Sequence, residues 1–291
     1  MKAIKSVPLL LTLSLLSACG QPKLPANHGK VETRLYIGKG ENQPLIVGLG
    51  GSEGGNAWDS DQWKQTRDRF LDEGYAFLAL GYFGAPGTPE QLDRISINGV
   101  RDAILEVSKD PKIDPTKIAL IGGSKGAELA LLMASKYDDI TCVVGIVPSH
   151  TAFPALTFLA SNSSWMQGEE EIPFVPMTWA AAPSAAKRDL RTAFEIMMED
   201  KEAVKKAEIH VEKINGPILL VSATKDEMWP STEMSDIIMA RLKSNNFPHT
   251  YEHIKVEGGH NKPLDHFDEI FDFLNRNFKK SSSQDLLNKQ K

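Results

Sequence analysis

The apolar residues of this chain fall into short continuous runs that are separated by longer, amphipathic segments. The runs are rich in Val, Ile, Leu and aromatic residues, as is typical of strands buried on both faces of a sheet. Their alternation with helix-length segments predicts an α/β fold, a mostly parallel sheet with helices on both faces. The predicted strands cover residues 33–36, 45–49, 75–80, 118–121, 142–147, 218–222 and 251–256.

One predicted strand, 118–121, runs into the pentapeptide GGSKG at 122–126 and then into a helical pattern over 127–137. Strand, sharp turn and helix are the context of a nucleophile elbow, which exposes a serine hydroxyl toward a base. Glycines at both ends of the pentapeptide fit this reading, because side chains there would collide with the neighbouring strand and helix. The pentapeptide alone is common by chance, so its context carries the prediction. We interpret Ser124 as a candidate nucleophile.

A candidate acid and a candidate base follow in the chain order that α/β-hydrolases use. Asp226 comes just after the predicted strand 218–222, and His260 comes after 251–256. In an open parallel sheet, the carboxyl ends of the strands are where ligands and catalytic groups gather. We therefore assign His260 as general base and then acid, and Asp226 as the group that orients the imidazole of His260.

Two alternatives to these assignments remain open in the sequence. His150 also follows a predicted strand, but it precedes the acid in chain order. Glu227 is adjacent to Asp226 and competes with it as the acid.

The oxyanion hole of such a site needs two backbone amides. The first is expected from Lys125, and the second from the glycine-rich loop after strand 45–49, either Gly51 or Ser52. A dinucleotide or phosphate loop is the competing interpretation of this loop. It fails because Glu53 occupies the position of the last glycine in Gly-x-Gly-x-x-Gly, and no Walker-type Gly-Lys-Ser is present.

The strand and helix alternation breaks over residues 148–207, where prolines stand among aromatic and methionine side chains. We expect a cap insertion here, over the site, whose apolar side chains hold an acyl group. Alternatively, these side chains pack only a small core within the cap.

The N-terminus predicts a secretory signal. A basic start, an apolar stretch over 7–16 and the sequence LSAC at 16–19 resemble a bacterial lipobox. This implies a lipoprotein signal peptide at 1–18, lipidation of Cys19, a polar tether over 19–30 and attachment to a membrane of the cell envelope. An ordinary cleaved signal is the alternative. The hydrolase domain is expected over 31–278, with a polar tail at 279–291.

Composition excludes several classes of function. The formal net charge of −5 gives no basic footprint for nucleic acid. Neither a Cys-x-x-Cys nor a His-Glu-x-x-His spacing occurs, so we expect neither a metal nor another cofactor. If Cys19 is lipidated, Cys142 has no partner for a disulfide and is expected as a buried thiol. The oligomeric state is not predicted.

Several segments together resemble the catalytic domain of the acyl-CoA thioesterase and bile acid-CoA:amino acid N-acyltransferase family. They are GSKGAELA at 123–130, GGSEGG at 50–55, LALGYF at 78–83, VEKINGPI at 211–218 and GGH at 258–260. The resemblance covers about 31–278 and implies an α/β-hydrolase fold with a triad at Ser124, Asp226 and His260. Amino-acid conjugation in that family goes with cysteine at the elbow, so the serine here implies water as the acceptor.

The sequence thus predicts a membrane-tethered serine hydrolase that cleaves acyl thioesters, as an acyl-CoA thioesterase does, or carboxylic esters, and that works through an acyl-enzyme. The alternatives are an envelope carboxylesterase similar to dienelactone hydrolase, an acyltransferase, and an acyl-binding lipoprotein without catalysis.

Overall fold

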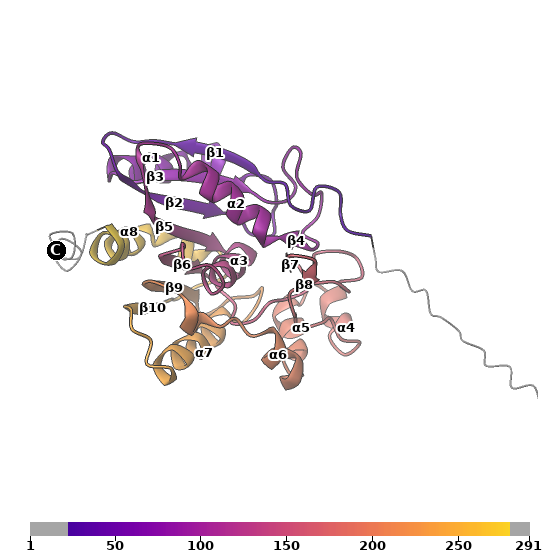
Figure 1. The fold of residues 1–291 in the computed structure, drawn as a ribbon. Helices are drawn as coiled ribbons and strands as arrows, with labels where there is room; N and C mark the ends of the chain where they lie inside the picture. The colour runs from indigo at the N-terminus through magenta and orange to yellow at the C-terminus, as the bar shows by residue number, and fades with distance from the viewer. Residues whose placement is uncertain (1–22, 280–291) are drawn as a thin grey trace, which may run out of the picture.

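The computed structural model describes residues 23–279 and contains one large sheet. Its strands are β1 (Glu32–Tyr36), β2 (Gln43–Leu49), β3 (Ala76–Gly81), β5 (Ile113–Gly123), β6 (Cys142–Ile146), β9 (Ile218–Ala223) and β10 (Tyr251–Val256). The order across the sheet is β1-β3-β2-β5-β6-β9-β10 (Figure 1). Only β1, paired with β3, runs antiparallel to its neighbour in this sheet. The mostly parallel sheet predicted from the sequence is confirmed.

Helices cover both faces of this sheet (Figure 1). They are α1 (Lys64–Asp72), α2 (Ile97–Val107), α3 (Lys125–Ala134), α7 (Ser231–Ser244) and α8 (Phe267–Leu274). Successive residues of a strand point to opposite faces, and in β2 both faces are apolar. Leu45, Val47 and Leu49 pack with side chains of α2, α3 and α7. Ile46 packs with side chains of α1 and α8 on the other face, so the sheet lies between two apolar layers.

Residues 148–207 leave the main sheet after β6 and return before β9. They carry β7 (Trp165–Gln167), β8 (Glu170–Glu171), α4 (Ala182–Ala186), α5 (Leu190–Met197) and α6 (Lys201–Ala207). β7 pairs with β8 and with β4 (Ile95–Ser96), which forms a small second sheet. Phe153, Val175 and Met197 form a third apolar cluster with Trp229. The insertion therefore has a small core of its own.

The first described residues pack beside the insertion. The carbonyl of His28 accepts a hydrogen bond from the amide of Ser96, at 2.8 Å. The carbonyl of Lys23 accepts one from Arg94, at 3.1 Å. The predicted signal peptide at 1–18, Cys19 and residues 280–291 of the predicted tail lie outside the described residues.

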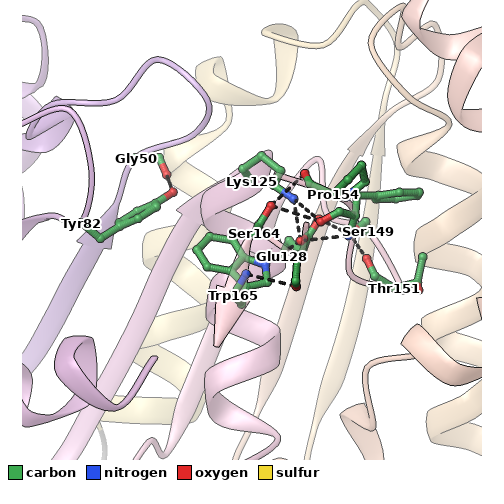
Figure 2. Close-up of polar contacts among 11 residues, drawn as sticks. Gly50, Tyr82, Lys125, Glu128, Ser149, Thr151, Pro154, Ser164 and Trp165 are labelled. Carbon is green, nitrogen blue, oxygen red and sulfur yellow. Dashed lines mark hydrogen bonds and ion pairs between the residues drawn. The ribbon is translucent and has the colours of Figure 1, made fainter. Parts of the chain in front are cut away.

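A buried acid on α3 joins the elbow to the insertion (Figure 2). Glu128 is fully buried, and its Oε1 accepts hydrogen bonds from Lys125 Nζ at 2.7 Å, Trp165 Nε1 at 2.7 Å and the amide of Phe153 at 3.2 Å. Lys125 is also buried, and its ammonium donates to the carbonyl of Phe153 at 3.3 Å. Burial lowers the pKa of Lys125, and the charge of Glu128 opposes this shift. One carboxylate thus ties α3 to two segments of the insertion.

We expect Glu128→Leu to be strongly destabilising, because it leaves the Lys125 ammonium buried without a counter-charge. Removing one partner of a buried ion pair costs about 3–5 kcal/mol, whereas replacing both by apolar residues costs much less. Urea denaturation should therefore give a large loss for Glu128→Leu and a partial recovery for the double variant Lys125→Met, Glu128→Leu.

The matched control is Glu106→Leu, which breaks the exposed pair of Glu106 with Lys109 and should change the unfolding free energy little. Similar stabilities for Glu128→Leu and Glu106→Leu would contradict the role given to Glu128.

Candidate active site

Ser124 occupies the turn between β5 and α3 in a strained backbone conformation, with φ 53° and ψ −119°. Non-glycine residues rarely adopt a positive φ, and such strain persists only where the surroundings enforce it. Here the Ser124 amide donates to the carbonyl of Ile146 in β6 at 2.9 Å. Added side chains would collide with the Gly126 carbonyl at Gly122, and with the Gly50 carbonyl at Gly126. The two glycines therefore permit the sharp turn, as the sequence predicted.

Asp226 and His260, which follow β9 and β10, lie in contact. His260 Nδ1 is 2.8 Å from Asp226 Oδ1. Since an ionised carboxylate only accepts hydrogen bonds, Nδ1 carries the proton and leaves Nε2 as an acceptor. Asp226 is only 1 % exposed, and Oδ1 also accepts from the amides of Met228 and Trp229, at 3.0 and 3.3 Å.

The charge of Asp226 is favoured by its partners. Burial raises the pKa of Asp226. The hydrogen bond of His260, the charge of its protonated ring, and hydrogen bonds from Ser231 and the Met228 amide together outweigh burial and hold the pKa below its ordinary value. Glu227 makes a different contact, because its Oε2 accepts from the backbone amide of His260 at 2.9 Å. Of the two adjacent carboxylates, Asp226 thus contacts the imidazole and Glu227 contacts the main chain.

Ser124 and His260 border the same cavity, which has a volume of about 260 Å³. Its walls include Glu53 and Glu227, two exposed carboxylates, together with Trp58. Within residues 23–279, no Lys or Arg lines this cavity. This half of the site, called the polar cavity below, is therefore acidic as well as aromatic.

The glycine-rich loop after β2 lies against the elbow, and a side chain added at Gly51 would lie 3.5 Å from the Ser124 Cβ. The Gly51 amide donates to Glu53 Oε1 at 2.9 Å. In the described part of the chain, the Ser52 amide has no hydrogen-bond partner. The buried hydroxyl of Tyr82 donates to the Gly50 carbonyl at 2.6 Å and fixes the loop (Figure 2).

Lys125 begins α3, so its amide has no acceptor within the helix. Of the two loop amides proposed from the sequence, the one at Ser52 has no acceptor among the described residues, whereas the one at Gly51 donates to Glu53.

A second cavity of about 440 Å³ begins at the same serine and extends beneath the insertion. It shares Ser52, Ser124 and Met228 with the polar cavity. Its other walls are mostly apolar and include Phe153, Leu156, Met177, Ala185, Ala193, Phe194 and Met197. We call it the acyl cavity, since its size and lining are typical of sites for apolar ligands. Phe153 and Phe194 of the insertion line this cavity and also belong to the insertion's own apolar cluster.

The remaining candidates lie away from the two cavities. His150 is buried and borders neither of them. Burial, and then the charge of Lys201, lower the pKa of His150 to about 4, so it is neutral at pH 7. Cys142 is a buried free thiol. No group of three or more His, Cys, Asp or Glu residues within 23–279 is arranged to hold a metal ion.

Three residues of the site region were missed in the sequence. Glu53 binds a loop amide, and Glu128 and Trp165 hold α3 and the insertion together. The spacing of Lys125 and Glu128, three residues apart, signals a helical ion pair, but such pairs are usually exposed. Nothing local in the sequence points to Trp165 as their partner.

Solved structures with the same fold are hydrolases. An acylaminoacyl peptidase of Pyrococcus horikoshii matches with a TM-score of 0.62 at 16 % identity, over 87 % of this chain and 40 % of its own. An esterase of Pyrococcus furiosus matches with a TM-score of 0.57 at 16 % identity, over 87 % of this chain and 89 % of its own. The fold is therefore that of the α/β-hydrolases.

Curated relatives are acyl-CoA thioesterases. The peroxisomal succinyl-coenzyme A thioesterase of Mus musculus is 25 % identical over 237 residues, which are 78 % of this chain and 51 % of the relative. Acyl-coenzyme A thioesterase 6 of Homo sapiens is 32 % identical over 126 residues, which are 43 % of this chain and 28 % of the relative. The chain spans about half the length of the curated relatives that match most of it.

A family model, described as BAAT / Acyl-CoA thioester hydrolase C terminal, matches residues 98–263. The match includes the elbow, the insertion, Asp226 and His260. The chain therefore belongs to the BAAT / acyl-CoA thioester hydrolase C-terminal family.

Proposed function

We propose that this protein is a serine hydrolase that cleaves acyl thioesters or carboxylic esters through an acyl-enzyme. Ser124 is the proposed nucleophile, His260 the general base and acid, and Asp226 the group that orients His260. One observation above all supports this proposal. Ser124, held at a strained elbow, borders the same cavity as His260. The Nδ1 atom of His260 is hydrogen-bonded to the buried carboxylate of Asp226.

In the proposed reaction, Ser124 Oγ attacks the acyl carbonyl carbon while His260 Nε2 takes the hydroxyl proton. The tetrahedral intermediate collapses, and the bond to the leaving sulfur or oxygen breaks as His260 protonates that atom. Water then attacks the carbonyl carbon of the acyl-enzyme while His260 Nε2 takes one of its protons. The bond to Ser124 Oγ breaks as His260 returns that proton to Oγ, which restores the serine hydroxyl and releases the carboxylic acid.

The amides of Lys125 and Ser52 are the proposed oxyanion hole. Both are free of other acceptors among the described residues, and both flank Ser124. Such donors stabilise the charge that develops on the carbonyl oxygen in the transition state. The proposed chemistry needs no metal and no cofactor, because the serine, the imidazole and these amides supply every step.

Two substrate classes have support. Family membership and the named thioesterase activity of the relatives favour an acyl thioester. The carboxylates of Glu53 and Glu227 in the polar cavity favour a leaving group without negative charge near the reaction centre, hence a carboxylic ester. Acyl-CoA is the first thioester to test, and a neutral ester of the same acyl chain is its counterpart.

The proposed location is a membrane of the cell envelope, with the protein held by a lipid on Cys19. The supporting observation is the signal-like pattern that ends in LSAC at 16–19.

Replacement of Ser124 by Ala is expected to reduce hydrolysis by a factor of about 10⁴ or more, because no nucleophile remains. The assay uses matched acyl-CoA thioesters and nitrophenyl esters from short to long chains, with the chain lacking residues 1–19. Circular dichroism of the variant checks that it folds. A variant that keeps more than about a tenth of the activity would refute the mechanism.

Asp226→Asn and Glu227→Gln form a matched pair. Asp226→Asn should lower kcat by about 10⁴, since the amide no longer favours the required tautomer of His260. Glu227→Gln should lower kcat much less, because the side-chain carbonyl still accepts from the His260 amide. Equal losses in the two variants would show that the contact to the imidazole is not what matters.

Ala185→Trp should fill part of the acyl cavity. Ala185 lines that cavity on α4, whereas its exposed neighbour Ala186 does not. We expect kcat/KM to fall about tenfold or more for long acyl chains and little for acetyl substrates. Ala186→Trp is the control and should leave the chain-length profile as it is; the same change in both variants would mean that acyl chains bind elsewhere.

A further inference from the structure

Four large apolar side chains of the insertion are exposed. Phe158 is 103 % exposed, Trp179 95 %, Leu159 73 % and Leu156 44 %. We call these four residues the rim. Apolar surface is favoured when it is removed from water, and contiguous exposed apolar residues mark surfaces for proteins or membranes.

The rim borders the acyl cavity. Leu156, Ala160 and Met177 line that cavity. Phe158 and Leu159 lie between the first two in the chain, and Trp179 lies two residues after Met177. The same two segments therefore line the acyl cavity and also carry exposed apolar side chains next to the lining residues in the chain.

The described chain begins beside the rim. The carbonyl of Lys23 accepts a hydrogen bond from Arg94 at 3.1 Å, and the Arg94 amide donates to Ser163 at 3.0 Å. Two residues earlier, the carbonyl of Leu92 accepts from the amide of Leu156 at 2.9 Å. The segment 92–94 thus connects the start of the described chain to both ends of the segment 156–163, which carries Leu156, Phe158 and Leu159 of the rim. Figure 1 shows this start on the side of the molecule that carries β4, β7 and β8.

The position of Lys23 restricts where a lipid anchor can enter a bilayer. Cys19 precedes Lys23 by four residues, and four extended residues span at most about 14 Å. An acylated Cys19 would therefore hold the protein on a membrane by the side that carries the rim. Trp and Phe are well suited to this position, because aromatic rings favour the boundary between headgroups and acyl chains.

Two exposed basic residues of the insertion fit a phospholipid surface. Lys187 and Arg188 are exposed and lie between Ala185 and Leu190, which both line the acyl cavity. Within residues 23–279, neither forms an ion pair with a carboxylate. Such residues are attracted to anionic headgroups.

We propose that the rim docks on the lipid bilayer that holds the protein, and that substrate acyl chains enter the acyl cavity directly from that bilayer. The docking part rests on the geometry of the rim and on the proposed lipidation of Cys19. The delivery part rests on the proposed hydrolase function. The substrate class that follows is an acyl ester or thioester whose chain resides in a membrane.

Trp179 provides the first test, which needs no catalysis. The full chain, produced with its own signal and lipid, is placed in phosphatidylcholine and phosphatidylglycerol vesicles whose acyl chains carry bromine, a quencher of tryptophan fluorescence. We expect quenching that is largely lost in Trp179→Phe, because Trp58, Trp165 and Trp229 are buried and Trp63 is half-buried in the wall of the polar cavity. Equal quenching in parent and variant would overturn the docking.

The competing occupant of the rim is a second copy of the chain. If Phe158→Cys cross-links two chains in the vesicles while Trp179 is not quenched, the rim is a protein interface and the proposal is wrong. Quenching of Trp179 without cross-linking supports the bilayer.

Delivery is tested by the ratio of two rates, hydrolysis of a long-chain ester held in vesicles over hydrolysis of a soluble short-chain ester. The double variant Phe158→Ser, Leu159→Ser should lower this ratio about tenfold or more, since the rim no longer contacts the acyl chains. The matched control is Ile237→Ser, an exposed apolar side chain on α7, which should keep the parent ratio. An unchanged ratio in the double variant would overturn delivery. A parent without activity on either ester or on the matched acyl-CoA thioesters would overturn the hydrolase function, and the Trp179 test would then decide docking alone.

Discussion

The backbone of Ser124 is the constraint on which the rest of the site depends. Its positive φ turns the chain sharply at the end of β5, so that α3 starts immediately and its first amide points back toward the serine. The turn is possible only because Gly122 and Gly126 carry no side chains where the elbow meets its neighbours. The hydrogen bond from the Ser124 amide to the carbonyl of Ile146 in the parallel strand β6 then fixes the turn at the carboxyl edge of the sheet. Strain of this kind is maintained by surrounding structure rather than by the residue itself.

Glu128 extends the constraint from the elbow to the insertion. Its Oε1 accepts hydrogen bonds from the Lys125 ammonium at the elbow, the Trp165 indole in β7 and the Phe153 amide in the segment after β6. A buried ion pair adds little to stability compared with an apolar replacement, because desolvation cancels most of the attraction. Its geometry is nevertheless specific, since each donor must stay within hydrogen-bond distance of one oxygen. The wall of the acyl cavity at Phe153 is therefore positioned by the same carboxylate that holds the elbow helix.

The sequence predicted the features that are encoded in a few consecutive residues and missed those that depend on contacts between distant segments. Strands β2, β3, β6 and β9 and the second half of β5 were found because each contains a continuous apolar run, whereas β1 and β10 mix apolar with polar residues. The elbow was found because its turn is encoded in five consecutive residues. β4, β7 and β8 were missed, since strands of two or three residues have no periodicity. Gly51 and Ser52 could not be distinguished because both follow β2; the difference between them is a side-chain contact from Glu53.

The two cavities meet at Ser124, and in the proposed reaction the acyl cavity holds the acyl chain of the substrate while the polar cavity holds its leaving group. The acyl cavity has a mostly apolar lining that includes residues of the two segments that carry the rim, whereas the polar cavity is bordered by His260 and two carboxylates. A substrate that reaches Ser124 from the apolar side leaves its sulfur or oxygen on the side of the imidazole that must protonate it. A released acid is repelled by Glu53 and Glu227, which favours its exit through the acyl cavity. Entry and exit of the acyl chain by the same apolar route is what a membrane-bound supply of substrate requires.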